Sequence, residues 1–235
     1  DGTVRFPALD WDGDDASLHP TNEPGYAVPL PKDAVRRRLR AAAVSWNRLE
    51  EILVAELKPA DGVLHGPSGR DDCLRAEALV SGPGRLRLFR AVVGDHAAAD
   101  ELPLTAEERR QLDRPGVGGQ ILDRLCRRRC PAAVKTDRLF GCLLAEAAVY
   151  ILKRAHDDGF PEDAPLCLGG RPACALPFFG PAAQEALAEA GFLHYLRPSV
   201  IDERGGNANL VGAVVPAEKA LRPEQFNRQE CQETP

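Results

Sequence analysis

Apolar side chains cover nearly the whole circumference of one predicted helix, over residues 137–155. The apolar positions are Leu139, Phe140, Leu143, Leu144, Ala147, Val149, Ile151 and Leu152. A helix that is apolar on almost every side has to be covered by other elements of the fold. Glu146 interrupts the run, which falls short of the ~20 apolar residues that a membrane span requires. We therefore expect this helix to be the central core element of a protein without membrane segments.

The rest of the pattern predicts a mainly helical α+β fold with one or two β-hairpins. Residues 33–58 repeat apolar side chains at spacings of three and four, which indicates one amphipathic helix that begins at Asp33 and ends before Pro59. Thr105 and Glu108 form a capping-box pattern that opens a short helix. A further helix is predicted around residues 121–125. Another is predicted over residues 181–190, with Pro at its first turn and Gly at its end.

Two segments indicate hairpins. Residues 74–80 and 85–93 are predicted as strands on either side of a Ser-Gly-Pro-Gly turn, and alternating Leu and Arg in the second strand suggest one wet face. Arg85, Arg87 and Arg90 would then form a basic stripe on a strand. Residues 199–203 and 209–215 form the second predicted hairpin. Strands and helices do not alternate regularly, which favours the α+β class over α/β.

The predicted domain organisation is a single globular domain with two extensions. Residues 1–31 carry five prolines and an acidic cluster, so we expect an extended N-terminal arm, with Trp11 and Tyr26 available to pin it to the body or to a neighbouring subunit. Residues 32–221 are predicted as one α+β domain. Residues 222–235 are polar, and we expect a frayed C-terminal tail.

Cysteine usage favours an intracellular protein, cytoplasmic or nuclear. The chain has seven cysteines, an odd number spread over a chain that is large enough to fold without disulfides. No basic segment followed by an apolar one, as in a signal peptide, is visible near the N-terminus, and the absence of an initial Met leaves open that one was removed. The pattern predicts free thiols in a reducing compartment.

Arginine dominates the basic residues, with 25 Arg against 5 Lys and no Met. Because Arg, Ala, Gly and Pro have GC-rich codons, this global bias indicates a GC-rich genome more than selection for anion binding. The net charge of −5 argues against a general polyanion binder. Any contact with an anionic partner therefore has to come from a local patch.

One basic patch lies at the start of the helix predicted over residues 33–58. Arg36, Arg37, Arg38 and Arg40 would occupy its first turns, where the helix dipole disfavours cations by up to ~1 kcal/mol. This placement predicts an anionic partner. An external phosphate backbone, an acidic protein surface and the chain's own aspartates at positions 10–15 all fit.

The second basic patch lies between two thiols. Arg127, Arg128 and Arg129 separate Cys126 from Cys130, and Pro131 is predicted to stop the helix there. Zinc sites commonly use two close ligand pairs, and the next pair, Cys167 and Cys174, is too widely spaced. We therefore favour a basic helix end with free thiols, and predict no metal and no cofactor.

Catalytic signatures are weak, so the sequence leaves open whether the protein is an enzyme. Cys142 lies within the buried helix and should be inert. The His156-Asp157 pair resembles part of a metal-dependent phosphohydrolase site, but further ligands are not evident, and a histidine stabilised at a helix C-terminus is the simpler reading. The glycines at residues 116–119 follow a predicted helix, whereas phosphate-binding loops follow a strand.

The sequence thus favours a non-enzymatic binding or regulatory domain. It would contact an acidic protein partner or its own subunits through Arg36, Arg37, Arg38, Arg40 and residues 127–129. One alternative is nucleic-acid binding through the same two patches. The other is a hydrolase or transferase whose site is assembled from non-local residues such as His156, Asp157 and Cys126.

Overall fold

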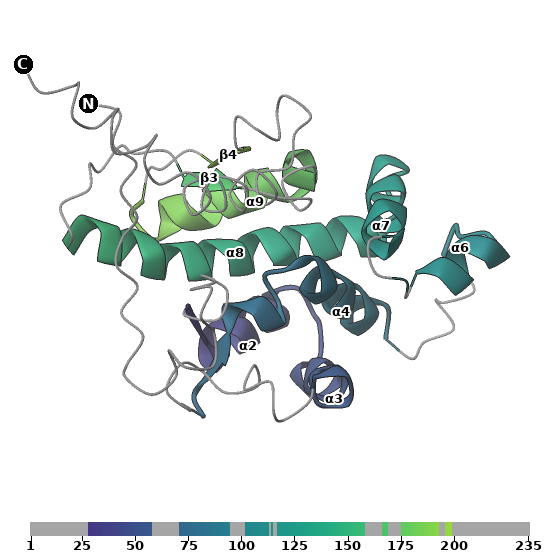
Figure 1. Cartoon of the computed structure of the whole chain (residues 1–235), viewed down its shortest axis with the longest axis horizontal. Coiled ribbons are helices and arrows are strands. Elements are labelled where there is room, and N and C mark those ends of the chain that lie inside the picture. Colours follow the sequence, from purple (N-terminus) through teal and green to yellow (C-terminus); the bar gives the residue numbers. More distant parts are fainter. Residues whose placement is uncertain are drawn as a thin grey trace, which may run out of the picture.

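The computed structural model describes residues 28–57, 71–94, 102–112, 114, 117–157, 166–168, 175–192 and 196–198. Within these ranges the fold is mainly helical α+β, which confirms the predicted class. A long helix, α8 (Pro131–Asp157), runs through the middle of the molecule, and α9 (Leu176–Glu189) lies along one side of it (Figure 1). The helices that precede α8 in the chain lie on its other side and beyond its N-terminal end.

The elements follow one another as β1 (Pro29–Pro31), α2 (Lys32–Ala41), α3 (Trp46–Glu56), β2 (Cys73–Arg75), the 3-10 turn η4 (Ala76–Ala78), α4 (Gly82–Val93), α6 (Ala106–Gln111), α7 (Val117–Arg127), α8, β3 (Leu166–Leu168), α9 and β4 (Leu196–Pro198). β1 pairs with β2 in antiparallel register, so that Leu30 faces Leu74. β3 pairs with β4 in parallel register.

Helix α8 buries apolar residues on two sides, as its sequence pattern predicts. Leu139, Phe140 and Leu143 belong to a core cluster that also contains apolar residues of α2, α3 and α4. Ala145, Ala148 and Leu152 form a second cluster with α9. Each fully buried large side chain stabilises the fold by roughly 1.5–3 kcal/mol through removal of apolar surface from water. The central role predicted for this helix is therefore confirmed.

Close approach of α8 and α9 depends on a glycine. A Cβ added at Gly141 would lie 2.3 Å from the carbonyl oxygen of Phe179, so any side chain there would push the helices apart. Beside this contact, the rings of Phe140 and Phe179 meet edge to face with centroids 5.1 Å apart. These contacts fix α9 against the middle of α8.

The single helix predicted over residues 33–58 is wrong, because the chain breaks between α2 and α3. Val44 N–H donates to the Leu39 carbonyl at 2.9 Å, and Ala43 adopts a φ of 49°. This is the Schellman geometry that ends helices, and Val44 packs against the apolar cluster that contains Leu39. Ser45 then caps α3 by accepting from Arg48 N–H. At the start of α2, Pro31 rather than Asp33 is the N-cap residue.

The predicted hairpin over residues 74–93 is also wrong. Only Cys73–Arg75 are extended, and the second predicted strand is the helix α4. Ser81 caps α4 by accepting from Gly84 N–H at 3.0 Å, and Pro83 occupies the first turn. A Cβ at Gly84 would lie 2.4 Å from the Leu79 backbone, so the tight entry into α4 requires glycine.

The other three predicted helices are present in the structure. The capping box of Thr105 and Glu108 opens α6, and α7 lies where it was predicted. Helix α9 begins at Leu176, earlier than predicted, and Pro181 lies inside it. Gly191 follows its end with a φ of 85°, which confirms the predicted stop.

Several predictions fall outside the described residues. These are the hairpin over residues 199–215, nearly all of the N-terminal arm and the tail over residues 222–235. The extent of the domain therefore stays a prediction. Among the helices that the structure describes, none has the length and apolar character to cross a lipid bilayer.

Candidate binding surface

Carboxylates of the protein itself neutralise most of the α2 arginines. Arg37 Nη2 and Arg38 Nε both donate to Glu146 Oε1, at 3.2 and 2.8 Å. Arg38 Nη1 also donates to Glu189 Oε2 at 3.2 Å, which ties α2 to both α8 and α9. The anionic partners predicted for Arg37 and Arg38 are thus glutamates of the same chain. Residues 10–15 lie outside the described residues.

Arg36 and Arg40 differ in how they are held. Arg36 donates to Asp33 at 3.2 Å and lies over the ring of Trp46, 4.7 Å from its centroid. Arg40 is exposed and forms no ion pair with another described residue. Of the four predicted binding arginines in α2, Arg40 has the guanidinium most available to a partner.

The predicted conflict between these arginines and the helix dipole is a further error that follows from the break after α2. Because α2 ends at Ala41, Arg38 and Arg40 lie in its last turn. The partial negative charge there favours cations. Burial opposes the charge on Arg38, but hydrogen bonds to Glu146 and Glu189 outweigh it and raise the pKa of Arg38 above its ordinary value.

A cleft with a volume of about 500 Å³ opens between α2, α8 and α9, beside these arginines. Its floor consists of Leu139, Ala182 and Ala186, which are buried, and the half-buried Cys142. Ala41 and Ala42 line it from the end of α2. A cleft of this size with a small, largely apolar floor is suited to receive side chains of a bound molecule.

The rim of the cleft carries positive side chains on one side and negative side chains on the other. Arg38, Lys135 and Arg138 come from α2 and α8, and Glu185 and Glu189 come from α9. The Lys135 ammonium donates to the Ala43 carbonyl at 3.5 Å and forms no ion pair with a described carboxylate. Arg138 and Glu185 approach to 3.7 Å across solvent-exposed surface, where such a pair contributes little. We call the α2 and α8 side the basic rim and the α9 side the acidic rim.

Cys142 is half-buried and faces this cleft, although the sequence placed it in the core. Burial raises the pKa of the Cys142 thiol, and the nearby Arg38 and Arg138 guanidinium groups lower it less. The thiol is therefore protonated near neutral pH, which makes it a weak nucleophile, as the sequence predicted.

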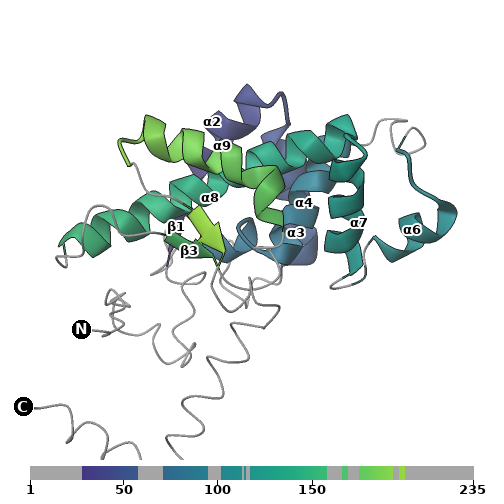
Figure 2. The ribbon, with the colours of Figure 1, turned by 90° about the horizontal axis from the view of Figure 1, so that it is seen from above.

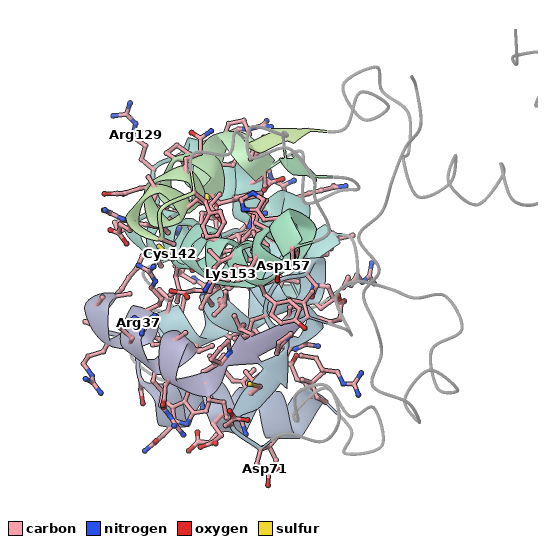
Figure 3. All side chains as sticks on the ribbon, turned by 90° about the vertical axis from the view of Figure 1, so that its left-hand side faces the viewer. Arg37, Asp71, Arg129, Cys142, Lys153 and Asp157 are labelled. Carbon is pink, nitrogen blue, oxygen red and sulfur yellow. The ribbon has the colours of Figure 1, made fainter. Side chains whose placement is uncertain are left out.

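The second predicted basic patch forms the turn between α7 and α8. Arg127, Arg128 and Arg129 are all exposed. Arg128 donates to the Pro103 carbonyl at 3.2 Å, whereas Arg127 and Arg129 form no ion pair with a described residue. In Figure 3, Arg129 projects on the same side of the molecule as Arg37 and Cys142. Between described atoms, no hydrogen bond or ion pair connects this turn with the arginines of α2.

A helix does end at this patch, as expected, because α7 ends at Arg127, but Pro131 begins α8 instead of stopping a helix. Arg129 adopts a φ of 57°, and Cys130 N–H donates to the Leu125 carbonyl at 2.9 Å. This repeats the Schellman geometry seen at the end of α2. Arg127 remains in the last turn of α7, as predicted.

Cys126 and Cys130 do not share one helix face, because α7 ends between them. Both are buried in a cluster with Phe89 and Ile121. Cys126 Sγ donates to Asp137 Oδ2 at 2.9 Å. Burial, and next the hydrogen bond to Asp137, raise the pKa of Cys126 well above its ordinary value. Cys126 is therefore a buried, hydrogen-bonded thiol that contributes to the packing between α7 and α8.

The same carboxylate holds a buried arginine that the sequence analysis assigned to a strand surface. Arg85 Nε and Nη2 donate to the two oxygens of Asp137 at 2.6 and 2.7 Å. Arg85 Nη1 donates to Asp123 at 2.6 Å. Burial opposes the charge, but these bonds outweigh it and raise the pKa of Arg85. This network joins α4, α7 and α8.

The structure does not bring together His156, Asp157 and Cys126. His156 lies in the last turn of α8, with its ring 5.6 Å from that of Phe192. Asp137, the hydrogen-bond partner of Cys126, lies about 28 Å away along the same helix at 1.5 Å per residue.

Cys73, Cys126, Cys130 and Cys142 carry free thiols. Within the described residues, no group of three or more His, Cys, Asp or Glu side chains is arranged to hold a metal ion. Comparison of the chain with protein-family models, curated proteins and solved structures finds no match in any of the three. The function therefore has to be argued from the surface geometry.

Proposed function

We propose that this chain is a non-enzymatic binding domain that receives an acidic segment of a partner protein, or of a second copy of itself, at the basic rim of the α2–α8–α9 cleft. One observation carries the proposal. Lys135 lines a cleft with a small, largely apolar floor, Arg40 is exposed next to Ala41, which also lines it, and neither cation is paired with a described carboxylate. A segment that combines acidic and aliphatic side chains would match both parts of this surface.

The distribution of carboxylates favours a protein partner over a nucleic acid. Glu146 and Glu189 hold Arg37 and Arg38, and Glu185 stands on the opposite rim. A phosphate backbone presents closely spaced negative charges, which these glutamates would repel. A protein segment can place single carboxylates against Arg40 and Lys135 and avoid the acidic rim.

The chemistry of the cleft supports a binding role rather than catalysis. Cys142 is the nucleophile that lines it, and its raised pKa keeps it protonated. No hydrogen bond connects Cys142 with a described histidine or carboxylate that would activate it. Arg38 is held by two glutamates and is suited to fix the shape of the cleft.

Nucleic-acid binding is the second candidate, and one observation favours it. Arg127 and Arg129 are exposed at the turn that leads into α8, where the positive end of a long helix adds to their charge. A phosphate at this turn would be attracted by both. The two candidates therefore predict different sensitive residues.

A fluorescence anisotropy titration separates the candidates. The probes are a short labelled peptide of alternating Glu and Leu and an oligothymidylate of equal charge, each at low and at moderate salt. We expect the peptide to bind, and Arg40→Glu with Lys135→Glu to weaken it about tenfold or more, a change of about 1.4 kcal/mol. Arg127→Glu with Arg129→Glu should leave peptide binding unchanged, as should the control Arg110→Glu on the exposed surface of α6.

Other outcomes would refute the proposal. Binding of oligothymidylate that is lost with Arg127→Glu and Arg129→Glu would establish the nucleic-acid reading instead. Failure of the peptide to bind at low salt, at a chain concentration low enough that no second copy occupies the cleft, would remove the acidic-segment proposal. Peptide binding that is insensitive to Arg40→Glu with Lys135→Glu would show that the cleft is not the site.

A further inference from the structure

We propose that the partner at this cleft is a second copy of the chain, docked in a two-fold arrangement in which the basic rim of each copy faces the acidic rim of the other. This inference rests on the proposed function and names its partner. It follows from the opposite charges of the two rims and from the small residues between them.

The rims are placed for such pairing. Helices α9 and α2 lie on opposite sides of α8 in Figure 1, and α9 lies in front of α8 in Figure 2. Arg38 lines the cleft from α2, and Glu185 and Glu189 line it from α9. Glu185 and Glu189 on α9 are largely exposed, with 64% and 58% of their side-chain surface accessible. A two-fold axis through the cleft exchanges its two sides, and would set these glutamates against Arg40 and Lys135 of the other copy, twice.

The middle of the cleft suits close approach of two copies. Ala42, Ala182 and Ala186 leave little side-chain bulk between the rims. Val134, one helical turn before Arg138 on α8, is 48% exposed although it is a large apolar residue. Burial of Val134 against the other copy would add an apolar contact to the ion pairs, as in the centres of protein interfaces.

Mixed charge is the reason to prefer a second copy over an unrelated acidic protein. An acidic segment compensates Arg40 and Lys135 but brings further negative charge near Glu185 and Glu189. A second copy supplies both signs at once, so that each rim can face the opposite charge across the axis. The arrangement is closed, because each copy uses the same surface once.

Charge-reversal complementation tests the arrangement. One variant carries Arg40→Glu and Lys135→Glu, and the other carries Glu185→Lys and Glu189→Lys. Each alone would place like charges across the axis, so sedimentation velocity on the full chain should show monomers. Mixed in equal amounts, the two variants restore opposite charges at both contacts, and a heterodimer should form. The wild type should dimerise, more weakly at high salt.

Controls distinguish loss of association from loss of folding. Glu189 also binds Arg38, so circular dichroism melts are compared with the wild type, and Val134→Lys provides a second route to the monomer that leaves all rim charges in place. Arg110→Glu on α6 should not change the sedimentation coefficient. A wild type that is monomeric at every concentration would overturn the second-copy inference, as would folded variants that fail to associate on mixing. If the acidic peptide still binds such a monomer, the proposed function stands and only its partner is wrong.

Discussion

Replacement of Arg85 by Met should be one of the most destabilising single changes in the described part of this protein. The Arg85 guanidinium donates to both oxygens of Asp137 and to Asp123. Met fills a similar volume but donates nothing. The Asp137 carboxylate, 1% exposed, would then retain only the weak Cys126 thiol donor among its described contacts.

The magnitude follows from the different exposure of the two carboxylates. Asp123 has 20% of its side chain accessible, so water can solvate it after the substitution. Asp137 has no comparable access, and loss of one partner of a buried ion pair costs about 3–5 kcal/mol. Since whole domains are stable by only about 5–15 kcal/mol, Arg85→Met should remove a large part of the free energy of unfolding.

Urea denaturation followed by circular dichroism measures this effect. A double variant, Arg85→Met with Asp137→Leu, removes both charges and should recover most of the loss, because well-packed apolar residues can replace a buried ion pair. The coupling free energy between the two positions should be about 2–3 kcal/mol. The control Arg110→Met, which breaks an exposed pair with Glu107, should change stability by less than about 0.5 kcal/mol.

Two results would refute this reasoning. A loss below about 1 kcal/mol for Arg85→Met would mean that Asp137 is not dependent on the guanidinium. Additive losses in the double variant would mean that the two side chains act independently, which the bidentate contact does not allow.

Two further predictions concern helix ends and pH. Ala43→Gly should stabilise the protein by up to about 1 kcal/mol in the same urea assay, because glycine adopts the left-handed conformation without the steric penalty of a Cβ. Gly191→Ala, at the equivalent position after α9, should destabilise it for the same reason. Equal effects of the two substitutions would contradict the left-handed conformation of both residues. Stability should fall as pH rises above about 8.5, since Cys126 loses its proton there in the unfolded chain, while its raised pKa keeps the thiol protonated in the folded protein. Stability measured against pH should decline less steeply for Cys126→Ala, and an unchanged slope would contradict the raised pKa.

Sequence patterns predicted the central helix and the capping box because both depend on local residues. The apolar circumference of α8 and the pairing of Thr105 with Glu108 need no knowledge of distant contacts. The break after Ala41 was missed because no glycine or proline marks it. An available signal was the apolar pair at Leu39 and Val44, which recurs as Leu125 with Cys130 and as Leu187 with Phe192.

The interpretation of residues 85–93 as a strand failed for a physical reason. Alternating Leu and Arg are typical of a strand with one solvent-exposed face. Here Arg85 is buried instead, because two carboxylates that are distant in the sequence compensate its charge. No local sequence pattern identifies Asp123 or Asp137 as a partner of Arg85. For the same reason, the pairing of Arg38 with Glu146 and Glu189 could not be foreseen, and the choice of Arg40 as the available cation required the structure.

The most direct test of the binding proposal is the affinity of the full chain for the Glu-Leu peptide at low salt, with and without Arg40→Glu and Lys135→Glu. We predict binding that weakens as salt increases and falls about tenfold or more in the variant, while the Arg110→Glu control binds as the wild type does. Equal affinities for the wild type and the cleft variant would contradict the account.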